Sequence, residues 1–329
     1  MRQIYFVLVE IIVIIFAVPK RNVIGELGEG GLILTSALDQ SKFLSSAGIL
    51  TSLRSLLDMT IDHCITQKRY GQHLSKFDLV KTDIARMCGR LHCLESMIYL
   101  TAGLYDITEF PDVEVESAIV KQYSADTSDY VVKTCCSLLG SRATTDDSPA
   151  LAFLKQNQFL QNYHGSANVL KTQIAINGIM YLMKHAGEEI LKKVSAINPI
   201  TLVKWTNYIR QHKSDRVPQV HKLSDCVHPR LMTTADKLEW VVEKIPFVAT
   251  NLVIKHGDFQ FPETDLVKLA DIVIETYAMT ATLSRANRSY IVGNLHGEHE
   301  IELAIPYVND TRYTIRLLGG IICTQLISD

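Results

Sequence analysis

The sequence predicts an all-α protein: a four-helix up-and-down bundle, an additional helical domain, and one β-strand at the N-terminus. From residue 32 onward, long segments with apolar residues at helical spacing follow one another. The 329 residues are 47% hydrophobic, which is enough to bury one large core or two moderate ones. The Val- and Ile-rich residues 11–15 are instead typical of a strand buried on both faces.

The N-terminal apolar run covers residues 4–18 and is interrupted by Glu10. It falls short of the roughly 18–20 residues that a membrane-spanning helix needs. No small-x-small cleavage site follows it, so the pattern does not favour a signal peptide. We therefore interpret it as a strand, although the sequence offers that strand no partner.

The first two bundle helices are predicted at residues 32–65 and from Phe77 onward. Ser75 and Asp78 form a pair that resembles a capping box at the start of the second helix. The apolar spacing of this helix predicts an inward-facing stripe, made of Leu79, Ile84, Met87, Leu91, Leu94, Met97 and Leu100.

The third helix is predicted to start after Pro111 and to end near Gly140. Glu114 and Glu116 place negative charge in its first turn, which the helix dipole favours. Residues 141–149 form a polar turn region, and a fourth helix is predicted after Gly165, running toward His185.

A second helical region is predicted after a linker at residues 199–229, which is polar and contains Pro218 and Pro229. We expect three further helices, at residues 231–256, 265–290 and 299–326. The predicted division is a strand remnant with its linker, the bundle, and the additional helical domain, at residues 1–31, 32–190 and 191–329.

Composition excludes several classes of function. With 33 basic and 35 acidic residues, the formal charge of −2 gives no footprint for nucleic acid. The seven cysteines include no C-x-x-C pair, which favours buried thiols in a reducing compartment. His296, His299 and Glu300 lack the H-E-x-x-H spacing, so we predict no metal site and expect a solvated helix start instead.

Several segments resemble the acyl-CoA dehydrogenase family. Residues 18–26, Val-Pro-Lys-Arg-Asn-Val-Ile-Gly-Glu, are similar to a family segment that joins the middle β domain to the C-terminal bundle. Residues 227–229 and 277–289 resemble the C-terminal extension of the very-long-chain branch, which includes a relative that serves in complex I assembly. The resemblance implies that the orphan strand is a remnant of the β domain.

The family's catalytic base is a glutamate that removes the α-proton of the acyl thioester while a hydride passes to flavin. In the corresponding segment, Tyr-His-Gly-Ser-Ala-Asn at residues 163–168, His164 stands at the place of the glutamate. Some branches carry the base on the first bundle helix, where this chain has Ser41. The imidazole could accept a proton at neutral pH, but its shape differs from that of a carboxylate. The resemblance thus implies an impaired enzyme.

The resemblance also implies contacts to substrate and cofactor. The predicted acyl-CoA contacts are Asp39, Lys42 and Gly165, and for Asp39 and Lys42 an ordinary solvated helix turn is an equal alternative. Lys42 replaces an arginine of the family and lacks its planar fork. The predicted FAD contacts are Gln67, Arg69, Tyr70, Ser137, Gly140, Ser166 and Asn168. Gln67 is neutral where the family has an arginine that grips the pyrophosphate, and Arg69 is a candidate substitute.

Three hypotheses follow from the resemblance. The chain is an FAD-dependent dehydrogenase of long-chain acyl-CoA in β-oxidation, impaired by the loss of its base. Alternatively, it is a non-catalytic mitochondrial scaffold of the complex I assembly type, with partners at the inner membrane or in the respiratory chain. In a third hypothesis, the sequence lacks upstream domains. A homodimer and a mitochondrial location, in the matrix or at the inner membrane, are implied by the family.

Overall fold

The computed structural model describes residues 19–26, 28–107, 112–145, 148–194, 222–256 and 261–325. The predicted strand at residues 4–18, Pro111 and most of the predicted linker lie outside these ranges. The chain divides into two units, residues 1–38 and 39–329. Helix dominates the described residues, which confirms the all-α class. The predicted domain boundary at residue 190 stays a prediction.

The first unit contains a short 3-10 turn, η1 (Lys20–Asn22), and the beginning of helix α1 (Gly30–Thr66). Gly25 adopts a φ of +73°, and a Cβ at that position would lie 2.7 Å from Ile33 Cδ1. Glycine is therefore favoured at position 25 by its backbone conformation, whereas the terminal methyl of the exposed Ile33 side chain can move away from a Cβ.

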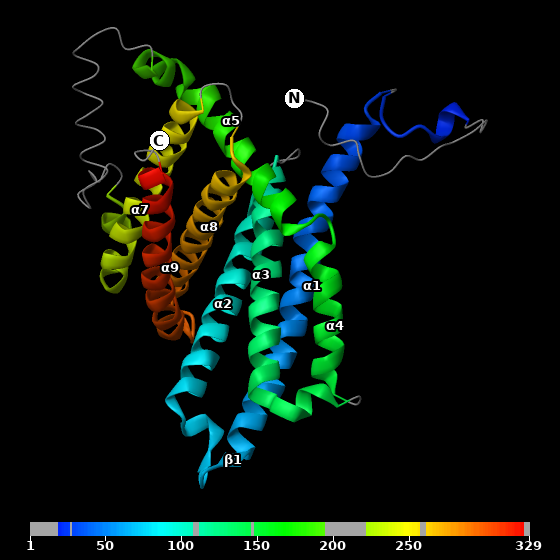
Figure 1. Ribbon diagram of the computed structural model, residues 1–329, viewed down its shortest axis with the longest axis vertical. Coiled ribbons are helices and arrows are strands. Elements are labelled where there is room, and N and C mark those ends of the chain that lie inside the picture. Colours follow the sequence, from blue (N-terminus) through cyan, green and yellow to red (C-terminus); the bar gives the residue numbers. More distant parts are fainter. Residues whose placement is uncertain are drawn as a thin grey trace. The chain divides into compact units, whose positions relative to one another are not determined.

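The second unit holds the rest of α1 and the other predicted bundle helices, α2 (Asp78–Ile107), α3 (Glu114–Leu139) and α5 (Ala167–Val194). Figure 1 shows α1, α2 and α3 running along one another. Ser75 lies in the 3-10 turn η2 (Leu74–Lys76), and Asp78 is the first residue of α2. Glu114 and Glu116 occupy the first turn of α3, as predicted.

Helix α4 (Pro149–Asn162) was not predicted from the sequence. It begins with Pro149 in its first turn, a position where proline is favoured. Polar contacts to α3 hold it: Ser128 Oγ donates to Asn157 Oδ1 at 2.6 Å, and Gln161 Nε2 donates to the Ala125 carbonyl at 2.8 Å. Ala150 is buried in the core, and Phe153, Leu154 and Leu160 pack against that core, so α4 also has an apolar face.

The apolar core of the second unit is continuous from the bundle into the C-terminal helices. Leu79, predicted to face inward, is 82% exposed, so the apolar stripe of α2 begins later than predicted. The fully buried positions of α1 and α2 include Leu56, Met87, Leu94 and Met97.

The C-terminal region contains the 3-10 turns η4 (Leu223–Cys226) and η5 (Pro229–Leu231), followed by α7 (Met232–Lys255), α8 (Glu263–Val292) and α9 (Gly297–Gln325). Helix α8 packs against α9, α2 and α5, and α7 packs against α8 and α9 (Figure 1). Among the described residues, no helix combines the length and the apolar character that crossing a membrane requires.

A network of ion pairs connects four helices of the second unit. The Glu95 carboxylate of α2 contacts Arg54 of α1 and Arg285 of α8, each at 2.7 Å, and Arg285 also contacts Glu300 of α9 at 3.2 Å. Burial alone would raise the pKa of Glu95, but hydrogen bonds and charges of Arg285 and Arg54 hold it below its ordinary value. The network joins the bundle to the C-terminal helices.

Truncating the core of α2 tests this arrangement. We expect Leu94→Ala to lower the free energy of unfolding by about 2–5 kcal/mol, because it leaves a cavity at a fully buried position. Leu79→Ala, on the same helix but largely exposed, is the matched control and should change it by less than about 0.5 kcal/mol. Urea unfolding measures both variants, and equal effects would contradict the core described here.

Candidate functional site

The turn between α4 and α5 brings His164 against α1. Ser41 Oγ lies 2.9 Å from His164 Nε2, and both side chains are partly buried. Ser41 and His164 are the two positions that sequence analysis compared with the alternative places of a catalytic glutamate. The fold therefore joins two residues that are 123 positions apart into one hydroxyl–imidazole pair.

The backbone of this turn uses two left-handed conformations in succession. His164 has a φ of +67° and Gly165 a φ of +117°, the latter a conformation that only glycine adopts readily. The Gly165 N–H donates to the Asn162 carbonyl at 3.2 Å. Gly165 thus shapes the turn, while Ser166 and Asn168 stand exposed at the start of α5.

Two lysines surround the imidazole of His164. Burial, together with the nearby charges of Lys121 and Lys42, lowers the pKa of His164 below its ordinary value. The ring also lies against Tyr163, with 3.9 Å between the ring centroids. His164 is consequently neutral at pH 7 and able to accept a proton.

Lys42 and Asp39 form a buried ion pair on α1, with 2.8 Å between Lys42 Nζ and Asp39 Oδ1. Burial raises the pKa of Asp39, and the hydrogen bond and charge of Lys42 only partly offset it. The alternative of a solvated helix turn does not fit, because both side chains are buried.

Lys121 of α3 is a residue that sequence analysis missed. It is fully buried, its Nζ donates to the Leu160 carbonyl at 2.8 Å, and burial lowers its pKa to about 8. The signal in the sequence was a lysine inside the otherwise uncharged run of residues 117–125. A charge at such a position indicates a functional or structural partner.

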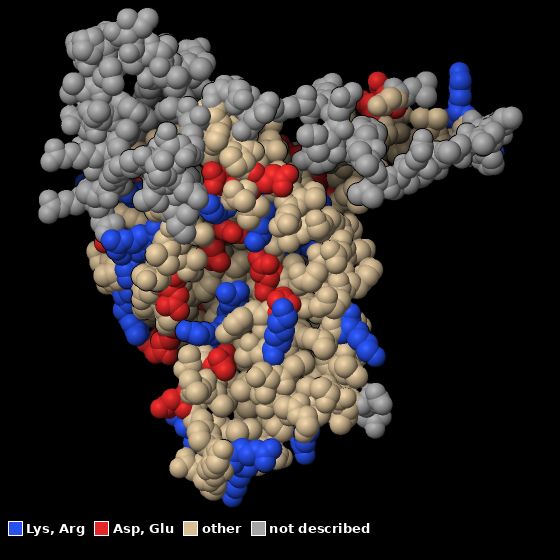
Figure 2. Space-filling model, in the orientation of Figure 1, with Lys and Arg blue, Asp and Glu red and all other residues tan. Residues whose placement is uncertain are grey.

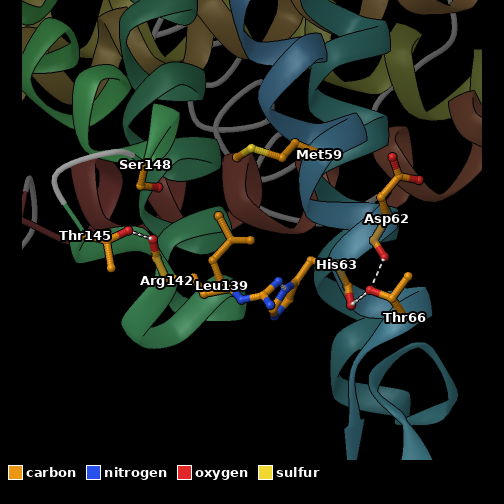
Figure 3. Close-up of a pocket in the computed structure, with 8 residues that line it drawn as sticks. All are labelled: Met59, Asp62, His63, Thr66, Leu139, Arg142, Thr145 and Ser148. Atoms are coloured by element: carbon orange, nitrogen blue, oxygen red, sulfur yellow. Dashed lines mark hydrogen bonds between the residues drawn. The ribbon is translucent and has the colours of Figure 1, made fainter.

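A second site lies where the end of α1 meets the connection between α3 and α4. A cavity of about 480 Å³ opens there, lined by Met59, Asp62, His63, Thr66, Leu139, Arg142, Thr145 and Ser148. Figure 3 shows Arg142 and His63 pointing toward one another, and Arg142 Nη1 lies 3.4 Å from His63 Nδ1. Burial, then the charges of Arg142 and Arg69, lower the pKa of His63.

The two segments predicted to contact flavin flank this cavity. After α1, residues 67–71 lead into a hairpin of β1 (Lys68–Arg69) and β2 (Gln72–His73). Tyr70 and Gly71 form its tip, with φ values of +49° and +77°, and the Tyr70 side chain is 97% exposed. Basic side chains gather at this end of the molecule, at the bottom of the view in Figure 2.

The other flanking segment is the end of α3. Gly140 has a φ of +60°, caps the helix with its N–H on the Cys136 carbonyl, and begins the 3-10 turn η3 (Gly140–Thr144). Ser137 is exposed on the last turn of α3. The turn carries Arg142, which sequence analysis passed over because the comparison there was with a glycine-rich segment.

Metal ligation is not indicated in the described part of the chain, where no group of three His, Cys, Asp or Glu side chains converges. Glu300, one of the residues weighed earlier, is bound to Arg285. His299 lies 3.9 Å from Glu302 at an exposed position.

Comparison with known proteins agrees with the resemblance seen in the sequence. Residues 28–178 match the family model "Acyl-CoA dehydrogenase, C-terminal domain", and residues 229–318 match "ACAD9/ACADV, C-terminal domain". The mitochondrial very long-chain specific acyl-CoA dehydrogenases of Mus musculus and Homo sapiens are 25% and 26% identical to this chain. Each match covers 86% of this chain and 43% of the relative.

Solved structures share the fold. An acyl-CoA dehydrogenase complexed with FAD from Bacillus anthracis has a TM-score of 0.74 at 16% identity, covering 95% of this chain and 53% of that chain. Caenorhabditis elegans ACDH-11 in complex with C11-CoA has a TM-score of 0.63 at 17% identity, covering 87% of this chain and 45% of that one.

The helical bundle with its C-terminal helices, taken with both family matches, identifies the class: the chain belongs to the acyl-CoA dehydrogenase family. Within the family, its C-terminal region belongs with the very-long-chain branch, whose domain it matches over residues 229–318. The chain spans less than half the length of the curated very-long-chain relatives that it matches.

The buried lysine beside His164 gives a pH-dependent prediction. Because the pKa of Lys121 is about 8 in the folded protein and 10.5 ordinarily, the unfolded chain binds more protons between these values. Stability should therefore rise, relative to Lys121→Met, as the pH increases from 8 toward 10.5, by about 1–3 kcal/mol. Urea unfolding of both proteins at pH 7 and pH 10 measures the difference, and a constant difference would refute the assigned shift.

Proposed function

We propose that this chain is an acyl-CoA-binding relative of the FAD-dependent dehydrogenases of long-chain acyl-CoA, in which dehydrogenation is impaired. The hydrogen bond between Ser41 and His164 carries this proposal. It occupies both places at which relatives hold a carboxylate base, and neither residue supplies a carboxylate. Abstraction of an α-proton depends on a base whose geometry and pKa match the substrate, and a 1 Å displacement costs about a hundredfold.

The proposed binding of acyl-CoA is supported by the charged groups beside this pair. Lys42 and Asp39 are buried together on α1, and Gly165 shapes the turn that holds His164. The ammonium groups of Lys42 and Lys121 are near enough to lower the pKa of His164. Positive charge at this place suits a polarised thioester carbonyl. The names of the relatives, very long-chain specific dehydrogenases, support a long acyl chain.

FAD is the cofactor that the family implies, and Arg142 supports the cavity near His63 as the proposed place of its phosphates, against one carboxylate in the lining, that of Asp62. Arg142 provides the guanidinium charge that Gln67 lacks, and His63 provides a second polar group across the cavity. Arg69 and the exposed ring of Tyr70 stand on the adjoining hairpin, and Ser137 and Gly140 lie at the end of α3. Ser166 and Asn168, at the exposed start of α5 in the other subunit of the proposed homodimer, are the proposed polar neighbours of the ring system. When bound, flavin accepts the hydride from the β carbon of the acyl chain.

The proposed assembly and location follow the family. In a homodimer, the hairpin and the end of α3 would meet the flavin of the neighbouring subunit. The relatives from Mus musculus and Homo sapiens are named as mitochondrial proteins, which supports a mitochondrial location for this chain, in the matrix or at the inner membrane.

A second candidate function is a scaffold of the complex I assembly type. An apolar patch favours it: Ile291, Val292 and Leu295, at the end of α8 and the following turn, are 67%, 65% and 92% exposed. These residues fall within the range that matches the ACAD9/ACADV domain. Clustered exposed apolar side chains are typical of protein-binding surfaces. A scaffold would need neither bound flavin nor catalytic turnover. It would be expected to bring respiratory-chain proteins with it when the chain is purified from mitochondrial membranes.

Restoring a carboxylate tests the impairment. In a sample that shows the visible absorption of bound flavin, we expect His164→Glu to raise acyl-CoA dehydrogenase turnover at least about a hundredfold over wild type, measured with an electron-accepting dye. His185→Glu, at an exposed histidine of α5, is the matched control and should give no gain. Substantial turnover by the wild-type chain with its own flavin would overturn the proposal.

The phosphate cavity gives a separate prediction. Arg142→Ala should weaken the binding of FAD about tenfold or more, because a hydrogen bond to a charged group contributes about 1.5–3 kcal/mol. Arg86→Ala removes an exposed arginine of α2 outside this cavity and should leave binding unchanged. Titration calorimetry measures both affinities, and an equal response of the two variants would remove Arg142 from the proposed cofactor site.

A further inference from the structure

The hydroxyl and imidazole that replace the carboxylate base are themselves a reactive combination. Ser41 Oγ lies 2.9 Å from His164 Nε2, within the 2.6–3.2 Å that joins a nucleophile to its general base. We propose that Ser41 and His164 form a nucleophile–base pair that hydrolyses the thioester of a bound acyl-CoA. The inference rests on the acyl-CoA binding proposed above, and it adds an activity that needs no flavin.

The charged groups around His164 favour its action as a general base. Lys42 and Lys121 are the charged groups near the ring, and Lys42 is paired with Asp39. Burial and these two ammonium groups lower the pKa of His164, which favours the neutral imidazole before the reaction. In the tautomer with a free Nε2, the Ser41 hydroxyl donates to that nitrogen. The same positive charges would stabilise the negative oxygen of a tetrahedral intermediate.

The proposed groove for the acyl chain is lined by residues that lie four positions from each member of this pair, Ser45 and Leu160. Its volume is about 680 Å³, and α1, α3 and α4 supply its apolar walls, which include Ile49, Leu53, Val132, Phe153, Phe159 and Leu160. Ser45, which also lines it, lies one helical turn beyond Ser41. Leu160, on the opposite wall, precedes His164 by four residues. Both chain segments that carry the pair therefore continue directly into the groove.

The size and the lining of the groove suit a long acyl chain. Pockets for small ligands have volumes of about 300–1,000 Å³ and mainly apolar walls. A chain that occupies the groove would present its thioester at the end where Ser41 and His164 meet. The arrangement thus places the nucleophile on α1 opposite a base in the turn between α4 and α5, and the proposed acyl-binding surface follows one helical turn further along α1.

The reaction balances without an oxidant. Ser41 Oγ attacks the carbonyl carbon of the thioester, and its proton passes to His164 Nε2. The carbon–sulfur bond breaks, its electron pair goes to the sulfur of CoA, and the sulfur takes the proton from His164. Water then attacks the acyl-serine ester, giving one proton to His164, which returns it to Ser41 Oγ as that bond breaks. The products are a fatty acid and free CoA.

The test uses the full chain and palmitoyl-CoA, with release of the CoA thiol followed by a thiol-reactive dye. Ser41→Ala and His164→Asn should each lower the rate at least about a hundredfold. Matched controls are Thr51→Ala, which removes an exposed hydroxyl from α1, and His185→Asn, which removes an exposed imidazole from α5. Both controls should keep the wild-type rate. Circular dichroism verifies that each variant remains helical.

A second measurement keeps the inference falsifiable if Ser41→Ala fails to fold. A fluorophosphonate probe should label the wild-type chain at Ser41, found by mass spectrometry of the peptides, and His164→Asn should suppress the labelling. Thiol release no faster than in buffer, release unchanged in Ser41→Ala, or labelling at another serine would each overturn the inference.

Binding of a non-hydrolysable thioether analogue of palmitoyl-CoA separates the two proposals. Binding with no hydrolysis of palmitoyl-CoA would refute the nucleophile–base pair and leave the proposed acyl-CoA binding intact. Absence of binding would refute both.

Discussion

The contact between Ser41 and His164 closes the bundle where α1 meets the turn between α4 and α5. His164 and Gly165 take successive left-handed conformations in this turn, and the imidazole reaches the Ser41 hydroxyl of α1. This contact places His164 beside the charged groups and the groove that define the candidate site. Burial, together with the charges of Lys121 and Lys42, lowers the pKa of His164 and favours the neutral ring. The groove along α1 is lined from Ser45, one helical turn beyond Ser41. A carboxylate in the same place would have made a proton acceptor of a different shape, without a nucleophile beside it.

The Glu95 ion-pair network connects helices of the C-terminal region to α1, the bundle helix that carries Ser41 and Lys42. Its carboxylate receives Arg54 of α1 and Arg285 of α8, and Arg285 in turn holds Glu300 of α9. Charged groups that are partly buried in this way need their partners, because an unpaired charge in such surroundings is strongly unfavourable. The orientation of α1, which carries Ser41 and Lys42, is thereby coupled to α8 and α9 as well as to its own bundle.

Sequence reasoning found the described α-helices of 24 residues or more, and it missed the 14-residue α4. Asn157 and Gln161 bond α4 to α3, while Phe153, Leu154 and Leu160 pack its apolar face against the core. Leu79 fits the periodic pattern of α2 but lies near its first turn, outside the core. Lys121 and Arg142 come from segments distant in sequence from the residues they approach, and only the packing of the helices brings them together. The identities of His164 and Ser41 were readable directly, whereas their mutual contact was not.

The hairpin after α1 offers a last consequence. Tyr70 is almost wholly exposed at a tip whose backbone is already fixed in a strained, left-handed conformation. Strain at such a position persists only where the neighbouring structure enforces it, here the paired strands β1 and β2. The backbone beneath this aromatic ring has little freedom left to lose when another surface binds it. Association through the ring would therefore order the side chain but would avoid the backbone ordering penalty of a long, flexible segment.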